Sequence, residues 1–162
     1  MSSRKLKRAS ADGGDRCAEG DVFAVPLRNG GYARAVVTRT SKMGRILIGY
    51  FFGPELADFH GKHDSLEPRD SMAIMRFGGL GIIAGDWPRI GKISEWNRYA
   101  WCSPKFLRED PISNRAWLVT YADDDPSVEF TAEPCRPGLT GYERAGLAGS
   151  GVVELKLTEM LS

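Results

Sequence analysis

The sequence has few of the residues on which disulfide frameworks, zinc sites and membrane spans depend. Its three cysteines, Cys17, Cys102 and Cys135, are far apart and show no CxxC spacing, which argues against both a disulfide framework and a zinc site. No apolar run approaches the roughly 18 residues of a membrane span. No apolar stretch follows the basic N-terminus, as a secretory signal would require. We therefore expect a cytoplasmic chain with reduced thiols and no membrane contact.

A marked excess of charge of one sign is also missing. The formal net charge is +1, and residues 1–19 contribute five basic and three acidic side chains, which leaves −1 for the remainder. A general binder of nucleic acid would need many more lysines and arginines, so the charge argues against that partner. We expect a disordered basic arm over residues 1–19 and one domain over 20–162.

Groups suited to catalysis or metal binding are scarce. His60 and His63 lie with Asp58 and Asp64 in a polar loop, but ligands crowded into one short loop rarely converge on a metal without other elements. Cys102 has no base or cation beside it in the sequence that would activate its thiol, so we expect a buried structural cysteine. The glycines at 78, 79 and 81 lack the lysine of a phosphate-binding loop. We therefore predict no enzyme activity, no cofactor and no metal.

The chain does have a series of short alternating segments that predict β-strands. These segments span 21–27, 32–40, 45–52, 71–77, 96–101, 116–121 and 128–131. Asn29-Gly30 is a strong hairpin signal between the first two. Gly53-Pro54 is expected to end the third strand, because proline cannot donate a ladder hydrogen bond.

The C-terminus changes to helical periodicity. Ser150 is expected to cap a helix through Leu161, with Val153 and Leu157 on its apolar stripe. Together the elements predict a mainly β (α+β) fold. We expect a small curled antiparallel sheet or a partly open SH3-like barrel, with the C-terminal helix packed on it.

Two groups of residues are candidates for partner binding. Asp123, Asp124 and Asp125, with Glu129, form the densest acidic stretch, which is either a plain solvated turn or a surface for a basic partner. The four tryptophans either fill the core or line a peptide-binding groove, as in SH3-like modules. The sequence leaves both alternatives open.

Four segments occur in a specific order along the chain, at 20–33, 85–91, 101–110 and 121–124. Their distinguishing residues are Gly20, Asp21, Phe23, Pro26, Trp87, Pro88, Gly91, Trp101, Pro104, Phe106 and Tyr121. This order resembles the immunity protein 26 family of bacterial polymorphic toxin systems. The resemblance implies that these residues are determinants of the fold rather than contacts with a toxin.

The same resemblance implies a function. It implies a non-enzymatic protein that binds and neutralises a cognate toxin in the producing cell. Where the toxin is a nuclease, the acidic stretch at 123–125 would mimic its nucleic-acid substrate. The alternative is a small β-barrel module that binds nucleic acid or peptides, and a third hypothesis is an enzyme built around His60, His63 or Cys102.

Overall fold

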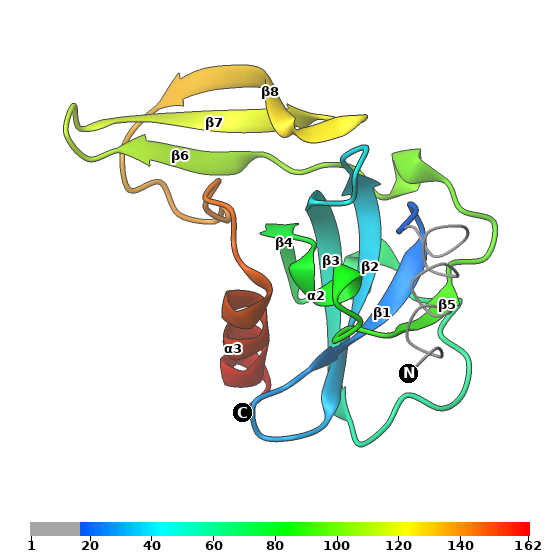
Figure 1. Cartoon of the computed structure of the whole chain (residues 1–162). Helices are drawn as coiled ribbons and strands as arrows, with labels where there is room; N and C mark the ends of the chain where they lie inside the picture. The colour runs from blue at the N-terminus through cyan, green and yellow to red at the C-terminus, as the bar shows by residue number, and fades with distance from the viewer. Residues whose placement is uncertain (1–16) are drawn as a thin grey trace, which may run out of the picture.

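The fold is built on two antiparallel sheets in the structure, a computed structural model that describes residues 17–162 (Figure 1). Residues 1–16, which hold most of the expected basic arm, lie outside the described residues. The arm's last three residues contact the domain, since Glu19 forms an ion pair with Arg98.

The main sheet has five strands in the order β4-β3-β2-β1-β5. They are β1 (Asp21–Pro26), β2 (Tyr32–Thr40), β3 (Ile46–Leu56), β4 (Ala73–Gly78) and β5 (Arg89–Lys92). The predicted hairpin joins β1 to β2. Gly30 and Gly31 there take φ angles of 87° and 77°, a conformation that glycine adopts without strain.

Strand β3 runs further than the sequence predicts. Gly53-Pro54 was expected to end it, but pairing resumes beyond the proline, where Leu56 lies opposite Tyr32. The register shifts between Tyr32 and Arg34, so the ladder is irregular at the point where the proline lacks its N–H. The prediction was wrong because such an irregularity leaves a residue unpaired without ending the strand.

The second sheet has three strands in the order β6-β7-β8, with β8 at an edge. They are β6 (Phe106–Asp110), β7 (Arg115–Ala122) and β8 (Asp125–Cys135). The strand predicted at 96–101 is wrong. That segment contains the 3-10 helix η2 (Arg98–Ala100), and the Asn97 side chain accepts a hydrogen bond from the Tyr99 N–H at its start.

Helix α3 (Ser150–Leu161) covers one face of the main sheet (Figure 1). Its Val153 and Leu157 are fully buried in a cluster with Phe51, Phe77 and Trp87. The residue that caps it is Gly149, not Ser150, and no side chain bonds to the cap. The expectation of a mainly β fold with a C-terminal helix on the sheet is confirmed, although the two sheets do not close into a barrel.

The shorter elements lie beside β4, and a second apolar cluster covers the other face of the main sheet. Helix α2 (Leu80–Ile83) and 3-10 helix η1 (Pro68–Asp70) lie in the connections that flank β4. On the face opposite α3, Trp101 and Ile93 pack with Val22, Tyr50 and Phe52. The main sheet therefore has apolar contacts on both faces.

Candidate partner-binding site

The second sheet joins the main sheet along a seam. Ile48 of β3 packs there with Phe106, Val119 and Tyr121 of the second sheet, and with Ala145. Figure 1 shows that the far end of the second sheet projects beyond this contact. The seam therefore fixes the position of β7, β8 and the turn between them.

Arg39 of β2 is the polar centre of the seam. Its Nε donates to Asp123 Oδ1 at 2.7 Å, and its side chain is only 3% exposed. Its Nη1 donates to the backbone oxygens of Thr38, at 2.7 Å, and Trp101, at 3.1 Å. A buried guanidinium is tolerated when its donors have acceptors. Arg39 thus fastens the β7–β8 turn to the main sheet.

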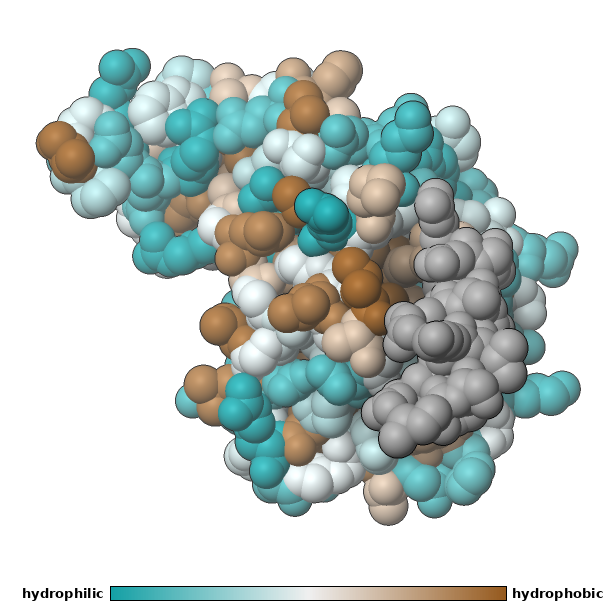
Figure 2. All heavy atoms as spheres, in the orientation of Figure 1, coloured by the Kyte–Doolittle hydropathy of each residue, from teal (hydrophilic) through white to brown (hydrophobic). Residues whose placement is uncertain are grey.

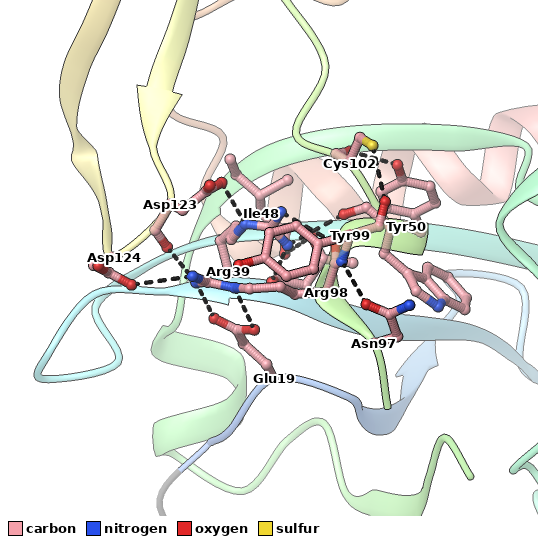
Figure 3. A network of polar contacts seen from close by, with 12 residues as sticks. Glu19, Arg39, Ile48, Tyr50, Asn97, Arg98, Tyr99, Cys102, Asp123 and Asp124 are labelled. Carbon is pink, nitrogen blue, oxygen red and sulfur yellow. Dashed lines mark hydrogen bonds and ion pairs between the residues drawn. The ribbon is translucent and has the colours of Figure 1, made fainter. Parts of the chain in front are cut away.

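Arg98 of η2 lies beside Arg39 and makes a second set of contacts. Its Nη2 donates to Glu19 Oε2 at 2.6 Å, and its Nη1 to Asp124 Oδ1 at 3.3 Å. The hydrogen bond to Glu19 raises the pKa of the Arg98 guanidinium above its ordinary value. Figure 3 shows the two guanidiniums between Glu19 on one side and the two aspartates on the other. Three carboxylates therefore face two guanidiniums, a local net charge of −1.

A further hydrogen bond holds the backbone beside this network. The Tyr50 hydroxyl donates to the Cys102 backbone oxygen at 2.5 Å (Figure 3). Burial raises the pKa of this hydroxyl, so it keeps its proton at neutral pH and remains a donor. The segment that follows η2 is thereby held against β3.

A hollow of about 470 Å³ opens at the seam. We call it the seam hollow. It is lined by Arg39, Tyr99, Cys102, Ser103, Thr120, Tyr121, Ala122, Asp123, Asp124 and Phe130. Two of its aromatic side chains are largely in solvent, since Tyr99 is 77% exposed and Phe130 is 76% exposed.

The structure brings together only two of the four acidic residues proposed from the sequence. Asp123 and Asp124 both line the seam hollow. Asp125 turns to its neighbour Ser127, whose hydroxyl lowers the pKa of that carboxyl. Glu129 accepts two hydrogen bonds from Arg108, at 2.7 and 3.1 Å. The acidic stretch is therefore largely paired and is not a continuous free anionic surface.

Most of the residues that carry the sequence resemblance lie in the interior. Gly20, Asp21, Phe23, Trp87, Trp101, Phe106 and Tyr121 are buried, and Pro26, Pro88, Gly91 and Pro104 are half-buried. Asp21 is a buried carboxylate, with Arg89 Nε at 3.2 Å and Lys92 Nζ at 3.4 Å. A Cβ added at Gly20 would lie 3.1 Å from the Trp96 ring, which shows how closely the chain passes there.

The residues considered for metal binding or catalysis are His60, His63 and Cys102, with Asp58 and Asp64. His60 is exposed, whereas His63 is buried, with its Nε2 3.0 Å from the Phe59 backbone oxygen. No group of three or more histidine, cysteine or acidic side chains within residues 17–162 could hold a metal ion. Cys102 is exposed, so the prediction of a buried cysteine is wrong. No helix among these residues is long and apolar enough to cross a membrane.

Sequence reasoning missed Glu19, Arg39, Arg98, Tyr99 and Phe130. Arg39 gave one usable signal, because an arginine after Val36-Val37-Thr38 in a strand needs an acceptor if it is buried. Its partner Asp123 is 84 residues away, however, and nothing local connects the two.

A second exposed surface is apolar and belongs to α2. Leu80 is 68% exposed and Ile83 is 61% exposed. Figure 2 shows apolar side chains in the middle of this face, where Figure 1 places α2. We call Leu80 and Ile83 the α2 patch. It contains no charged residue and is an alternative to the seam hollow as a partner-binding surface.

Within residues 17–162 the structure thus has two antiparallel sheets with an open recess at their seam. Residues 18–118 match the family described as Immunity protein 26. The chain therefore belongs to the immunity protein 26 family. No curated protein and no solved structure is significantly similar to it. The end of β7, the acidic turn, β8 and α3 follow the matched residues.

Proposed function

We propose that this protein binds a cognate toxin of a bacterial polymorphic toxin system and neutralises it, without catalysis, in the cytoplasm of the producing cell. Membership of an immunity protein family is the observation that carries the proposal. An inhibitor of this kind needs a rigid surface with a few strong anchors rather than a reactive group.

The seam hollow is the surface that we propose for the contact with the toxin. Its walls are held by the buried Arg39 and by the Arg98 ion pair, so little of the site has to be ordered on binding. Six of its ten lining residues lie beyond residue 118, outside the family match, whereas the other four, among them Arg39 and Tyr99, lie within it. A surface that selects one toxin fits best in a part of the chain that the shared family pattern does not define.

The proposal that the acidic stretch at 123–125 imitates nucleic acid takes a narrower form here. Asp123 accepts a hydrogen bond from Arg39, and Asp125 accepts one from Ser127. The Asp124 side chain, in contrast, is 93% exposed. We therefore place the electrostatic part of the contact on Asp124, with Glu129 as an outer contributor because it is already paired with Arg108.

The test uses the purified full chain and the purified domain of a toxin whose gene lies directly beside that of this protein. We expect a one-to-one complex by calorimetry and loss of the toxin's activity in the complex. Asp124→Lys should weaken binding and reduce its dependence on salt, because a steering charge is reversed. An unchanged affinity and salt dependence, in a variant that folds normally, would remove Asp124 from the contact.

The competing hypothesis of a nucleic-acid-binding module is tested in parallel. Filter binding of the full chain to mixed DNA and RNA should show no complex at physiological salt. A complex with nucleic acid, together with no affinity for the toxin, would favour the β-module hypothesis and contradict the immunity role.

A further inference from the structure

The seam hollow combines exposed aromatic rings with unneutralised negative charge, and this combination specifies the chemistry of what it binds. We infer that the seam hollow receives a lysine or arginine side chain of the toxin. The inference rests on the proposed function for the identity of the partner, and it adds the chemical class of the anchoring group.

Tyr99 and Phe130 supply the aromatic part of the hollow. Both rings line the same recess although more than three quarters of each side chain is exposed. The face of an aromatic ring attracts a cation, and the aliphatic stem of lysine or arginine packs on such rings. A neutral apolar side chain would use the rings but not the adjacent carboxylates.

The electrostatic part concerns Asp123 and Asp124. Each gives one oxygen, Oδ1, to an arginine, and within the described residues Oδ2 of neither carboxylate accepts a hydrogen bond. Among the side chains that line the hollow, these two carboxylates outnumber the single guanidinium of Arg39 by one. A cation that enters would complete the charge balance, whereas a phosphate would meet net repulsion.

The site is also held in place before binding. The Tyr99 N–H donates to Asn97 Oδ1 at 3.1 Å, and the Tyr99 backbone oxygen accepts a hydrogen bond from the Cys102 thiol at 3.2 Å. Phe130 belongs to β8 and lies at a register shift, between Glu129 and Thr131, which pair with Tyr121 and Thr120 of β7. Anchors on ordered backbone lose little conformational freedom on binding, which favours a contact of high affinity.

The decisive experiment is a calorimetric titration of the full chain with the toxin domain. Phe130→Ala and Tyr99→Ala should each weaken binding by about 30-fold, as expected for aromatic hot spots. Asp124→Asn should weaken it by about tenfold. Matched controls are Ile83→Ala in the α2 patch and Ile112→Ala, which is 96% exposed far from the hollow. Each control should remain within about twofold of the wild type.

The toxin's side of the contact is found by a double-mutant cycle. Each lysine and arginine of the toxin is replaced by methionine, and one of these changes should make the effect of Phe130→Ala largely disappear. Two results would overturn the inference. One is near wild-type affinity for the folded hollow variants, and the other is a loss of binding confined to Ile83→Ala.

A probe that does not depend on the toxin separates this inference from the proposed function. In an NMR titration, N-acetyl-arginine amide should shift the backbone amides of Tyr99, Asp124 and Phe130, whereas N-acetyl-glutamine amide should not. Equal shifts with both probes, or none with either, would contradict a cation site. Shifts specific to arginine in a chain that binds no toxin would instead contradict the proposed function alone.

The chain's own basic arm offers the same chemistry as the toxin and is the competing occupant. A full-length variant with Arg4, Lys5, Lys7 and Arg8 replaced by alanine should bind the toxin as the wild type does. Tighter binding by this variant would show that the arm and the toxin compete for the hollow, which would support a cation site there.

Discussion

At the scale of single residues, Trp87 shows why one side chain matters to the whole fold. It is 1% exposed, stacks on Phe77 with ring centroids 5.4 Å apart, and donates from Nε1 to Glu154 Oε2 at 2.8 Å. It therefore joins the sheet core to helix α3. A Cβ at Gly81 would lie 2.8 Å from Trp87 Nε1, so the site also requires glycine beside it.

Truncation of this side chain gives the first prediction. Trp87→Ala should lower the free energy of unfolding by about 3–5 kcal/mol, because it leaves a cavity in the main core and removes a hydrogen bond to α3. Urea unfolding followed by circular dichroism measures the change. Ile112→Ala is the control and should cost less than about 0.5 kcal/mol. A loss below about 1 kcal/mol for Trp87→Ala would show that Trp87 is not a core anchor.

The cysteines give a second prediction at this scale. Burial, with a smaller contribution from Asp21, raises the pKa of the Cys17 thiol to about 12, whereas Cys102 is exposed. At pH 8 in the folded protein, iodoacetamide should therefore modify Cys102 well before Cys17. Peptide mass mapping reads the order of modification. In urea the difference should vanish, and equally fast labelling of Cys17 in the folded state would contradict its placement.

At the scale of elements, the seam between the sheets depends on Arg39. Arg39→Met should reduce the free energy of unfolding by about 2–4 kcal/mol, because it leaves the Thr38 and Trp101 carbonyls without their donor. Chemical denaturation measures the loss. Lys105→Met, which breaks an exposed pair with Glu133, is the control and should have a much smaller effect, because solvent screens an exposed ion pair. Equal effects in the two variants would refute the role given to the seam.

Contacts of Glu109 with the segment after β8 make the stability of the fold depend on pH. The Gly138 N–H and the Arg144 guanidinium lower the pKa of the Glu109 carboxyl below its ordinary value. A carboxyl with a lowered folded pKa stabilises the fold above its unfolded pKa of about 4.3, and loses that effect as the pH falls through the folded pKa. The urea midpoint should therefore fall on acidification below about pH 4. Glu109→Gln should show a shallower decline, and parallel curves would contradict this assignment.

How far the sequence predicts these elements depends on whether their signals are local. The hairpin at Asn29-Gly30 and helix 150–161 were predicted because turn chemistry and periodicity lie within a few residues. The segment 96–101 was misread because its aromatic residues favour a strand, while Asn97 starts a 3-10 turn instead. Strand β6 was missed because only Phe106 and Leu107 are apolar, before a charged run that gains its partners in β7.

The candidate site was the least predictable part, for the same reason. Asp123 and Asp124 were selected as acidic residues, but their pairing with Arg39 and Arg98 depends on contacts between distant segments. The recess exists only because η2, β7 and β8 meet at one seam. The sequence pattern identified some residues of the site, but it could not show that they come together in the fold.

At the scale of the whole molecule, the two sheets contribute different parts: the main sheet holds most of the core, and the second sheet forms one side of the seam hollow. The main sheet lies within the family match, which continues through η2 and β6 into the start of β7. With α3, which lies outside the match, the main sheet contains most of the buried aromatic residues. The second sheet adds the end of β7, the acidic turn and β8, which form one side of the seam hollow.

The central claim is that this chain neutralises a toxin, and survival of intoxicated cells tests it most directly. A host that expresses the neighbouring toxin domain should stop growing alone and should grow normally when it also expresses the wild-type chain. The Phe130→Ala and Tyr99→Ala variants, at equal protein level, should protect poorly, and Ile112→Ala should protect fully. Continued growth arrest with the wild-type chain present in excess would contradict the account.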